Sequence, residues 1–201
     1  MNFYKICRSH LNRVLCIFIA LVAIVCTFCG CASVEREELE KAAPEIIERS
    51  RELLDYVYRD GLPYDTNGET IRKGFYPVSD EAEFKTKEEF LNALSEVFTV
   101  GYVSVISNTA FSEINVDEGR IEPRYIASDK IDEKGWLYIN TDFQINAVKR
   151  EADFDSFKII KCNKYMAKIE MKMLYDDHTS EVDTFVFKKE NGKWKLDSAA
   201  Y

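Results

Sequence analysis

The sequence predicts an α+β fold, in which N-terminal helices pack on a curved, mainly antiparallel β-sheet that ends in a β-hairpin. Three patterns lead to this prediction. Apolar residues recur near the 3.6-residue period of a helix between residues 46 and 98, and the period changes to two after Phe111. Near the end of the chain, Asn191-Gly192 is a strong signal for a hairpin turn. Helices followed by a run of strands are typical of the α+β class.

Residues 1–30 differ in composition from the rest of the chain. They contain three cations and no acidic residue, and the stretch 14–29 is almost wholly apolar. A basic start and a short apolar segment are typical of an export signal, and this segment is shorter than the ~20 residues that a membrane-spanning helix needs. We therefore interpret residues 1–30 as a signal that directs the protein out of the cytoplasm.

The end of this signal indicates a lipid anchor. Gly30-Cys31, a small residue directly before a cysteine, resembles the bacterial lipobox. This resemblance implies cleavage before Cys31, lipidation of that cysteine and attachment to the outer face of the cell membrane. The alternative is an uncleaved signal anchor, which leaves the domain on the same side of the membrane. The expected organisation is a lipoprotein signal peptide over 1–30, a membrane-proximal stem over 31–44 and a single α+β domain over 45–201.

Removal of the signal changes what the composition permits. The full chain has a net charge of −8 and six cysteines, whereas the chain without residues 1–30 has a net charge of −11. Such an acidic chain is not expected to bind nucleic acid, because proteins that do so carry basic patches. Only Cys31 and Cys162 remain, so we expect no disulfide framework.

Two helices are predicted with definite boundaries. Pro44 suits the first turn of one helix, and Gly61 ends it. Thr86 and Glu89 fit the capping box at the start of the other, where Phe84 is placed to pack on Phe90. The stretch from Gly101 to Ile106 is compatible with a further helix or with a strand. The apolar faces are expected to consist of Ile46, Ile47, Leu53, Leu54, Val57 and Tyr58 in the first helix, and of Phe90, Leu91, Leu94, Val97 and Phe98 in the second.

Alternating patterns predict the strands. They fall at 120–127, 135–139, 143–149, 165–175 and 181–189, with a two-residue turn at Asn191-Gly192 before the last segment. A two-residue loop places Phe187 opposite Leu196 and Lys189 opposite Trp194. Phe185, Phe187, Trp194 and Leu196 are then expected to share one face of the sheet.

The residues outside the signal offer little catalytic chemistry. They include one histidine, His178, and one further cysteine, Cys162, which an intervening strand would hold more than ~30 Å apart. Pairs of acidic residues are frequent, as expected in an acidic chain, and a metal site needs three or four suitably placed ligands. We predict no metal, no cofactor and no enzymatic activity; an enzyme would need a cluster of carboxylates inside a pocket. The sequence favours a binding or inhibitory protein.

Several segments together resemble a known family. Phe75-Tyr76-Pro77-Val78 leads to Phe84-Lys85-Thr86-Lys87-Glu88-Glu89, Gly135-Trp136-Leu137-Tyr138-Ile139 follows, and the chain closes with a hairpin ending in Glu190-Asn191-Gly192-Lys193-Trp194-Lys195. This order resembles the IseA-type DL-endopeptidase inhibitors of Gram-positive bacteria, over roughly residue 46 to the C-terminus. The resemblance implies a regulator without enzymatic activity that binds the catalytic domain of a cell-wall hydrolase of the NlpC/P60 type and blocks peptidoglycan cleavage. Secreted inhibitors of this kind need no lipid anchor, so the lipobox departs from the family pattern.

Two hypotheses therefore stand side by side. In the first, an acidic hairpin tip formed by Asp176, Asp177 and His178 occludes the cleft of the hydrolase, and the acidic surface steers the encounter. In the second, the chain is an NTF2-like lipoprotein domain that binds a small ligand or joins an envelope complex. That alternative predicts an apolar pocket inside the sheet, lined by Tyr165, Met171 and Phe185.

Overall fold

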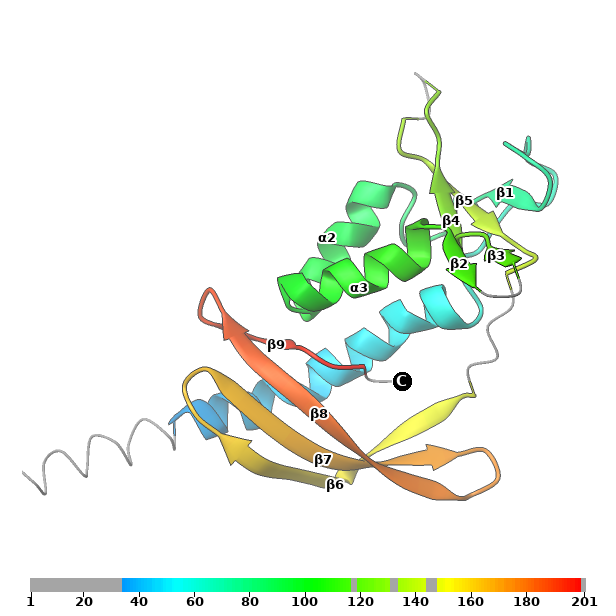
Figure 1. The fold of residues 1–201 in the computed structure, drawn as a ribbon. Coiled ribbons are helices and arrows are strands. Elements are labelled where there is room, and N and C mark those ends of the chain that lie inside the picture. Colours follow the sequence, from blue (N-terminus) through cyan, green and yellow to red (C-terminus); the bar gives the residue numbers. More distant parts are fainter. Residues whose placement is uncertain (1–33, 117–118, 131–133, 144–147, 200–201) are drawn as a thin grey trace, which may run out of the picture.

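The computed structural model describes residues 34–116, 119–130, 134–143 and 148–199. Over these residues the chain forms helices first and then mostly antiparallel strands, which confirms the α+β class (Figure 1). The expected signal over 1–30 and the expected lipidation site at Cys31 lie outside the described residues.

A long helix covers residues 34–58 and is the first element in the part of the chain that the structure describes. Its buried face repeats at intervals of three and four residues, as one stripe of a helix must. Ser50 belongs to this stripe, and its hydroxyl donates a hydrogen bond of 2.7 Å to the Ile47 carbonyl, so no buried polar group is left unpaired there. The stripe consists of Leu39, Ala43, Ile47, Ser50, Leu54 and Val57, each at most 1% exposed.

The expected stem over 31–44 needs correction where the structure describes it. Residues 34–44 form the first turns of the long helix, and Leu39 and Ala43 are fully buried in the domain core. Two apolar residues four positions apart attach this charged segment to the core because they lie on the same face of a helix, while most of its charged side chains stay exposed. Pro44 therefore stands inside the helix, where its missing N–H removes one backbone hydrogen bond, and not at the first turn.

The second and third helices begin at capped residues. Helix α2 (Lys87–Val97) has the predicted capping box: the Thr86 hydroxyl accepts from the Glu89 N–H, and the Glu89 carboxylate accepts from the Thr86 N–H. The rings of Phe84 and Phe90 pack with centroids 5.3 Å apart, as expected. Thr99 caps α3 (Val100–Phe111), so the stretch that was compatible with either structure is helical.

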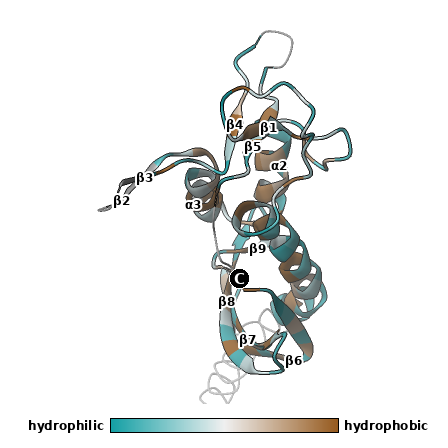
Figure 2. Cartoon of the chain, turned by 90° about the vertical axis from the view of Figure 1, so that its right-hand side faces the viewer, coloured by the Kyte–Doolittle hydropathy of each residue, from teal (hydrophilic) through white to brown (hydrophobic). Residues whose placement is uncertain are grey.

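The strands form two main sheets, whereas one continuous curved sheet was expected. The first sheet has the order β1-β5-β4 and consists of β1 (Phe75–Pro77), β5 (Leu137–Asn140) and β4 (Tyr125–Ala127). Strands β2 (Ile114–Val116) and β3 (Gly119–Ile121) form a separate ribbon that projects from the body of the molecule (Figure 2). The strand expected over 120–127 is therefore divided between β3 and β4, which belong to different sheets.

The second sheet is an antiparallel meander of four strands. These are β6 (Arg150–Cys162), β7 (Met166–Tyr175), β8 (Ser180–Glu190) and β9 (Lys193–Leu196). The predicted register of the last hairpin is confirmed, since Phe187 pairs with Leu196 and Lys189 pairs with Trp194. Asn191 and Gly192 both have positive φ, as a two-residue hairpin turn requires. Phe185, Phe187, Trp194 and Leu196 are all buried.

Strand β6 was not predicted. A strand was expected over 143–149, of which 144–147 lie outside the described residues and 148–149 precede β6. The pairing of β6 with β7 changes register between Asp153 and Lys158. There the Asp153 carboxylate accepts from the Asp155 N–H, and the Ser156 hydroxyl donates to the Asp153 carbonyl. This irregularity breaks the alternation by which a strand is recognised in sequence.

The long helix contacts both sheets. Near its start, Glu35 and Glu38 accept hydrogen bonds of 2.6 Å from Lys189 of β8. In its middle, Arg51 donates to the Arg150 carbonyl at the start of β6. At its end, the buried Tyr125 hydroxyl of β4 donates to the Tyr56 carbonyl over 2.6 Å and accepts from the Leu62 N–H. Because the two sheets share no strand, helices place one relative to the other: the long helix contacts both, and α2 pairs with the first sheet's region at Thr86 and with β9 at Phe98 (Figure 1).

We expect Gly61→Ala to destabilise the domain by about 3 kcal/mol, because a left-handed conformation and a close contact coincide there. Gly61 has φ +76°, and a Cβ atom would overlap Arg124 and Ile139. The Arg124 guanidinium cannot easily move, since it donates to the Arg59 and Asn140 carbonyls. Chemical denaturation measures the free energy of unfolding.

The matched control is Gly192→Ala. Gly192 has a similar φ of +79° but open space around the position of a Cβ atom. Its replacement by alanine should lower the free energy of unfolding by only about 1 kcal/mol. Equal losses of unfolding free energy in the two variants would show that the contact with Arg124 and Ile139 does not contribute to the destabilisation.

Candidate functional site

The β7–β8 turn carries the three residues that the sequence analysis proposed for partner binding. Asp176, Asp177 and His178 lie side by side in the chain between Tyr175 and Thr179, and all three are exposed. The Tyr175 N–H donates to the Thr179 carbonyl and the His178 N–H to the Tyr175 carbonyl, each over 3.0 Å. The structure therefore presents these residues on a closed, hydrogen-bonded turn at the end of two long strands (Figure 1).

The three residues have different roles in this turn. The Asp177 carboxylate accepts from the hydroxyl of Thr179 over 2.6 Å and from its N–H over 2.9 Å. These hydrogen bonds hold the pKa of Asp177 below its ordinary value. His178 has φ 65°, a left-handed conformation that closes the turn. Asp177 thus shapes the tip, and Asp176 and His178 are presented by it.

The cysteine–histidine pair is separated, as the strand length predicted. Cys162 pairs with Ala167 near the start of β7, whereas His178 follows Tyr175 at the other end of the same strand. Cys162 is a free, partly buried thiol, and burial raises its pKa. A thiol with a raised pKa is a poor nucleophile, since the thiolate is the reactive form.

Metal chemistry has no evident location in the part of the chain that the structure describes. No group of three or more histidine, cysteine, aspartate or glutamate side chains there is placed to hold a metal ion. In the same residues, no helix is both long enough and apolar enough to cross a membrane.

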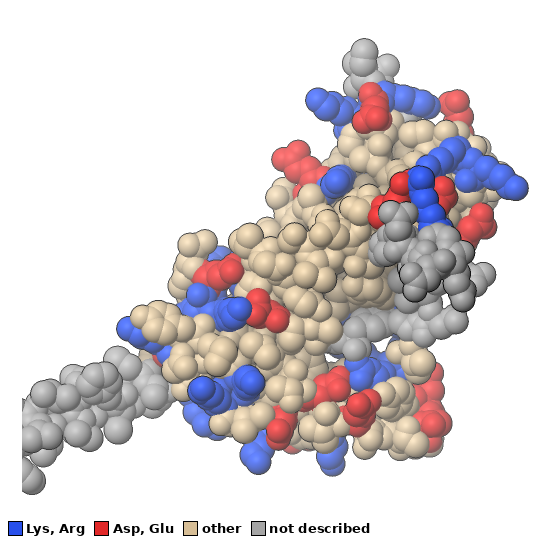
Figure 3. Space-filling view, viewed as in Figure 1, with Lys and Arg blue, Asp and Glu red and all other residues tan. Residues whose placement is uncertain are grey.

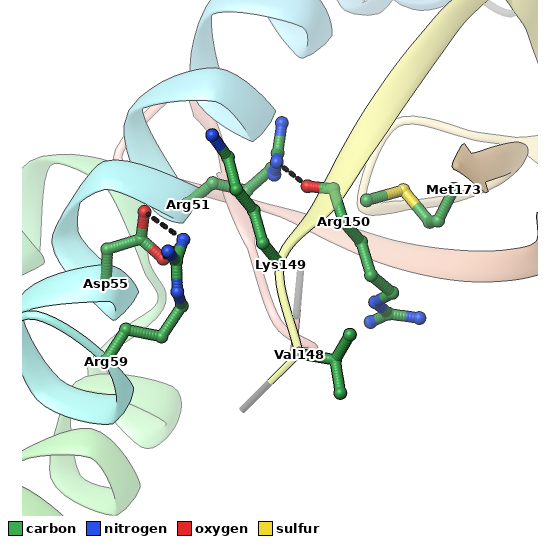
Figure 4. Close-up of a pocket in the computed structure, with 7 residues that line it drawn as sticks. All are labelled: Arg51, Asp55, Arg59, Val148, Lys149, Arg150 and Met173. Carbon is green, nitrogen blue, oxygen red and sulfur yellow. Dashed lines mark hydrogen bonds and ion pairs between the residues drawn. The ribbon is translucent and has the colours of Figure 1, made fainter. Parts of the chain in front are cut away.

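A basic pocket lies between the long helix and the start of β6 (Figure 4). Its three arginines already have partners within the fold: Arg51 donates to the Arg150 carbonyl, Arg59 pairs with Asp55, and Arg150 pairs with Asp183 at 2.8 Å. About 10 Å³ is open to a molecule the size of water, which is at the lower limit for holding a single water. The pocket therefore joins the helix to the sheet and has no room for an organic ligand.

A larger cleft of about 290 Å³ opens beside β1 and β5. Trp136 and Tyr138 form part of its wall, and Asp65, Glu69 and Asp80 lie around it. Asp80 forms an ion pair with Lys85 and Glu69 with Lys130, and the two carboxylate side chains are 93% and 86% exposed. Carboxylates that are so well solvated lack the desolvation by which active sites prepare an acid or a base.

The apolar pocket expected for an NTF2-like domain does not have the expected lining. Met171 and Phe185 are at most 1% exposed and belong to the main core, whereas Tyr165 is 66% exposed in the turn before β7. The three side chains therefore do not share one cavity.

Sequence reasoning overlooked an uncharged surface over α3. None of the twelve residues of this helix is charged, although 31% of the whole chain is. Val100 and Val105 are 74% and 53% exposed on it. Figure 3 shows this uncharged area in the middle of one face, and the acidic end of the β7–β8 hairpin lies at the edge of the same view. The signal was present in the sequence as a charge-free run of sixteen residues, 97–112.

Comparisons with known proteins add no relative to this description. No protein-family model matches the chain, and no curated protein matches it.

We expect the tip to depend on the ionised form of Asp177. Because its pKa is lowered in the folded chain, the stabilisation is present above the ordinary aspartate pKa and is lost as the pH falls through the lowered value. The chemical shift of the Thr179 amide should therefore titrate with a midpoint below that of an ordinary aspartate, as measured by NMR.

Two variants test the same contact. Asp177→Asn keeps an acceptor oxygen and should preserve the turn while abolishing the titration, whereas Asp177→Ala should loosen the backbone from Tyr175 to Ser180. A Thr179 amide that titrates normally in Asp177→Ala would contradict the assignment.

Proposed function

We propose that the protein is an extracytoplasmic, lipid-anchored binding protein that inhibits peptidoglycan DL-endopeptidases of the NlpC/P60 type without being an enzyme itself. The resemblance of its segments to IseA-type inhibitors motivates this proposal. The exposed β7–β8 tip is the structural observation that carries it, because an inhibitor must present a preformed projection to the cleft of its target.

The tip has the properties that such a role needs. Strands β7 and β8 are hydrogen-bonded from Met166 to Leu174, and the turn beyond them is closed by backbone and side-chain bonds. A rigid projection loses little conformational entropy when it enters a groove, so more of the contact energy contributes to affinity. Its carboxylates favour a basic rim on the target, and opposite charges also speed the encounter.

The uncharged surface over α3 supports the same orientation. Protein interfaces are depleted of charged residues at their centre and carry polar and charged residues at the rim. In the view of Figure 3 the α3 area is central and the acidic hairpin end is peripheral. A partner that covers this face would contact α3 at the centre and reach the acidic hairpin end at the rim.

The direct test is a peptidoglycan digestion by NlpC/P60 endopeptidases of the source organism, with residues 32–201 titrated in. Digestion should stop at micromolar protein. Asp176→Lys should weaken the inhibition at least tenfold, because it reverses an exposed charge at the tip. Glu81→Lys makes the same change at an exposed site elsewhere and is the control.

The outcomes separate the components of the proposal. Absence of inhibition across several such enzymes would refute the inhibitory function. Equal weakening by both lysine variants would assign the effect to overall charge and exclude the tip as the contact.

Lipidation is tested separately. Cys31→Ser should move the protein from the membrane fraction to the soluble extracytoplasmic fraction, since a thioether-linked lipid needs the cysteine sulfur. Cell fractionation with an antibody against the domain measures this change. A variant that stays in the membrane fraction would indicate retention by an uncleaved signal.

A further inference from the structure

A second surface lies at the opposite end of β8 from the tip. It is an open groove of about 750 Å³ between the long helix, the end of α2 and the β8–β9 hairpin. Strand β8 has eleven residues, so at ~3.3 Å per residue the groove and the tip are separated by roughly 30 Å. One partner contact at the tip therefore leaves the groove available.

The groove combines an apolar strip with an acidic border. Val97 and Trp194 are 5% and 6% exposed, and Ala42 and Ile46 are partly buried beside them. Five carboxylates surround this strip, against two cations, Arg49 and Lys193. The carboxylates are Glu38, Glu45, Glu48, Glu52 and Glu96.

The carboxylates are only partly neutralised by the protein itself. Lys189 pairs with Glu38, and Arg49 pairs with Glu52. Among the residues that the structure describes, Glu45, Glu48 and Glu96 form no ion pair. Three uncompensated negative charges thus border an apolar strip. This arrangement is complementary to a segment that carries both cations and apolar side chains.

Other occupants fit less well. The carboxylates are too dispersed for a single metal ion, since no group of three ligands is assembled among the described residues. An anionic lipid surface or a nucleic acid would be repelled by the same charges. From Glu38 to Glu52 the groove follows about 21 Å of helix, at 1.5 Å per residue. That length matches about six residues of an extended peptide or about fourteen residues of a helix.

We propose that this groove binds a basic, amphipathic peptide segment of a partner protein. The segment's lysine or arginine side chains pair with Glu45, Glu48 and Glu96, and its apolar side chains lie on Ala42, Ile46 and Trp194. The site does not depend on the proposed inhibitory function, because it uses different residues at the other end of the sheet.

The probe is a capped fourteen-residue amphipathic peptide of lysine and leucine. One companion has glutamate in place of lysine, and another has serine in place of leucine. The full chain is held in phosphatidylcholine nanodiscs, with empty nanodiscs as the reference. Fluorescence anisotropy of the labelled peptide measures its Kd. In a Trp136→Phe background the emission of Trp194, then the single tryptophan, reports directly on the groove.

The expected result is binding of the lysine–leucine peptide at least tenfold tighter than either companion, with a change in Trp194 emission. The combined Glu45→Gln, Glu48→Gln and Glu96→Gln variant should weaken it about tenfold, and Ala42→Arg should weaken it by filling the groove. The matched control neutralises three exposed glutamates elsewhere, Glu81→Gln, Glu88→Gln and Glu151→Gln, and should change Kd less than about twofold.

Three outcomes would overturn the proposal. The first is absence of binding at millimolar peptide, and the second is an equal loss in the control set, which would indicate attraction to overall charge. The third is binding without any response of Trp194, which would place the peptide elsewhere. We expect the glutamine variants to fold, because the altered glutamates lie outside the core. Circular dichroism and thermal unfolding check this.

Discussion

The burial of one face of the long helix is the constraint on which the rest of the fold depends. The two main sheets share no strand, so their relative placement depends on the helices packed between them. The helix stripe from Leu39 to Val57 lies in the same core as the inner faces of both sheets. Polar contacts then fix its ends, with Lys189 holding Glu35 at the start and Tyr125 holding the Tyr56 carbonyl at the end. Removal of solvent from this stripe therefore supplies both stability and the relative placement of the sheets.

The surfaces follow from the same arrangement. A helix with one buried stripe must expose its other faces, and here the neighbouring face carries the glutamates of the groove. A meander that buries one face against this helix leaves its turns free, and the β7–β8 turn becomes the tip. The basic pocket between helix and β6 joins elements together, although its composition resembles an anion site. Whether a charged cluster remains available to a binding partner therefore depends on its position in the fold.

Features that depend on neighbours in the sequence were predictable, and those that depend on distant segments were not. The capping box at Thr86 and the Phe187–Leu196 register follow from local spacing, and both are confirmed. The division into two sheets depends on which strands pair. The alternating pattern of each strand would be the same in one continuous sheet or in two separate sheets. Strand β6 was not predicted, because the register of its pairing with β7 changes after Asp153. The tip residues are consecutive and could be named, whereas the groove assembles Ala42, Val97 and Trp194 only after folding.

The junction between Cys31 and the helix sets the reach of a lipidated chain. Cys31 precedes residue 34, the first described residue of the long helix, by three positions, so even a fully extended backbone allows at most about 10 Å between them. Glu35 ties this end of the helix to Lys189, at one end of β8, while the acidic tip stands roughly 30 Å away at the other end. On so short a tether the tip would work within some tens of ångströms of the bilayer. A chain that is lipidated and inhibitory as proposed would therefore reach only hydrolases close to the membrane.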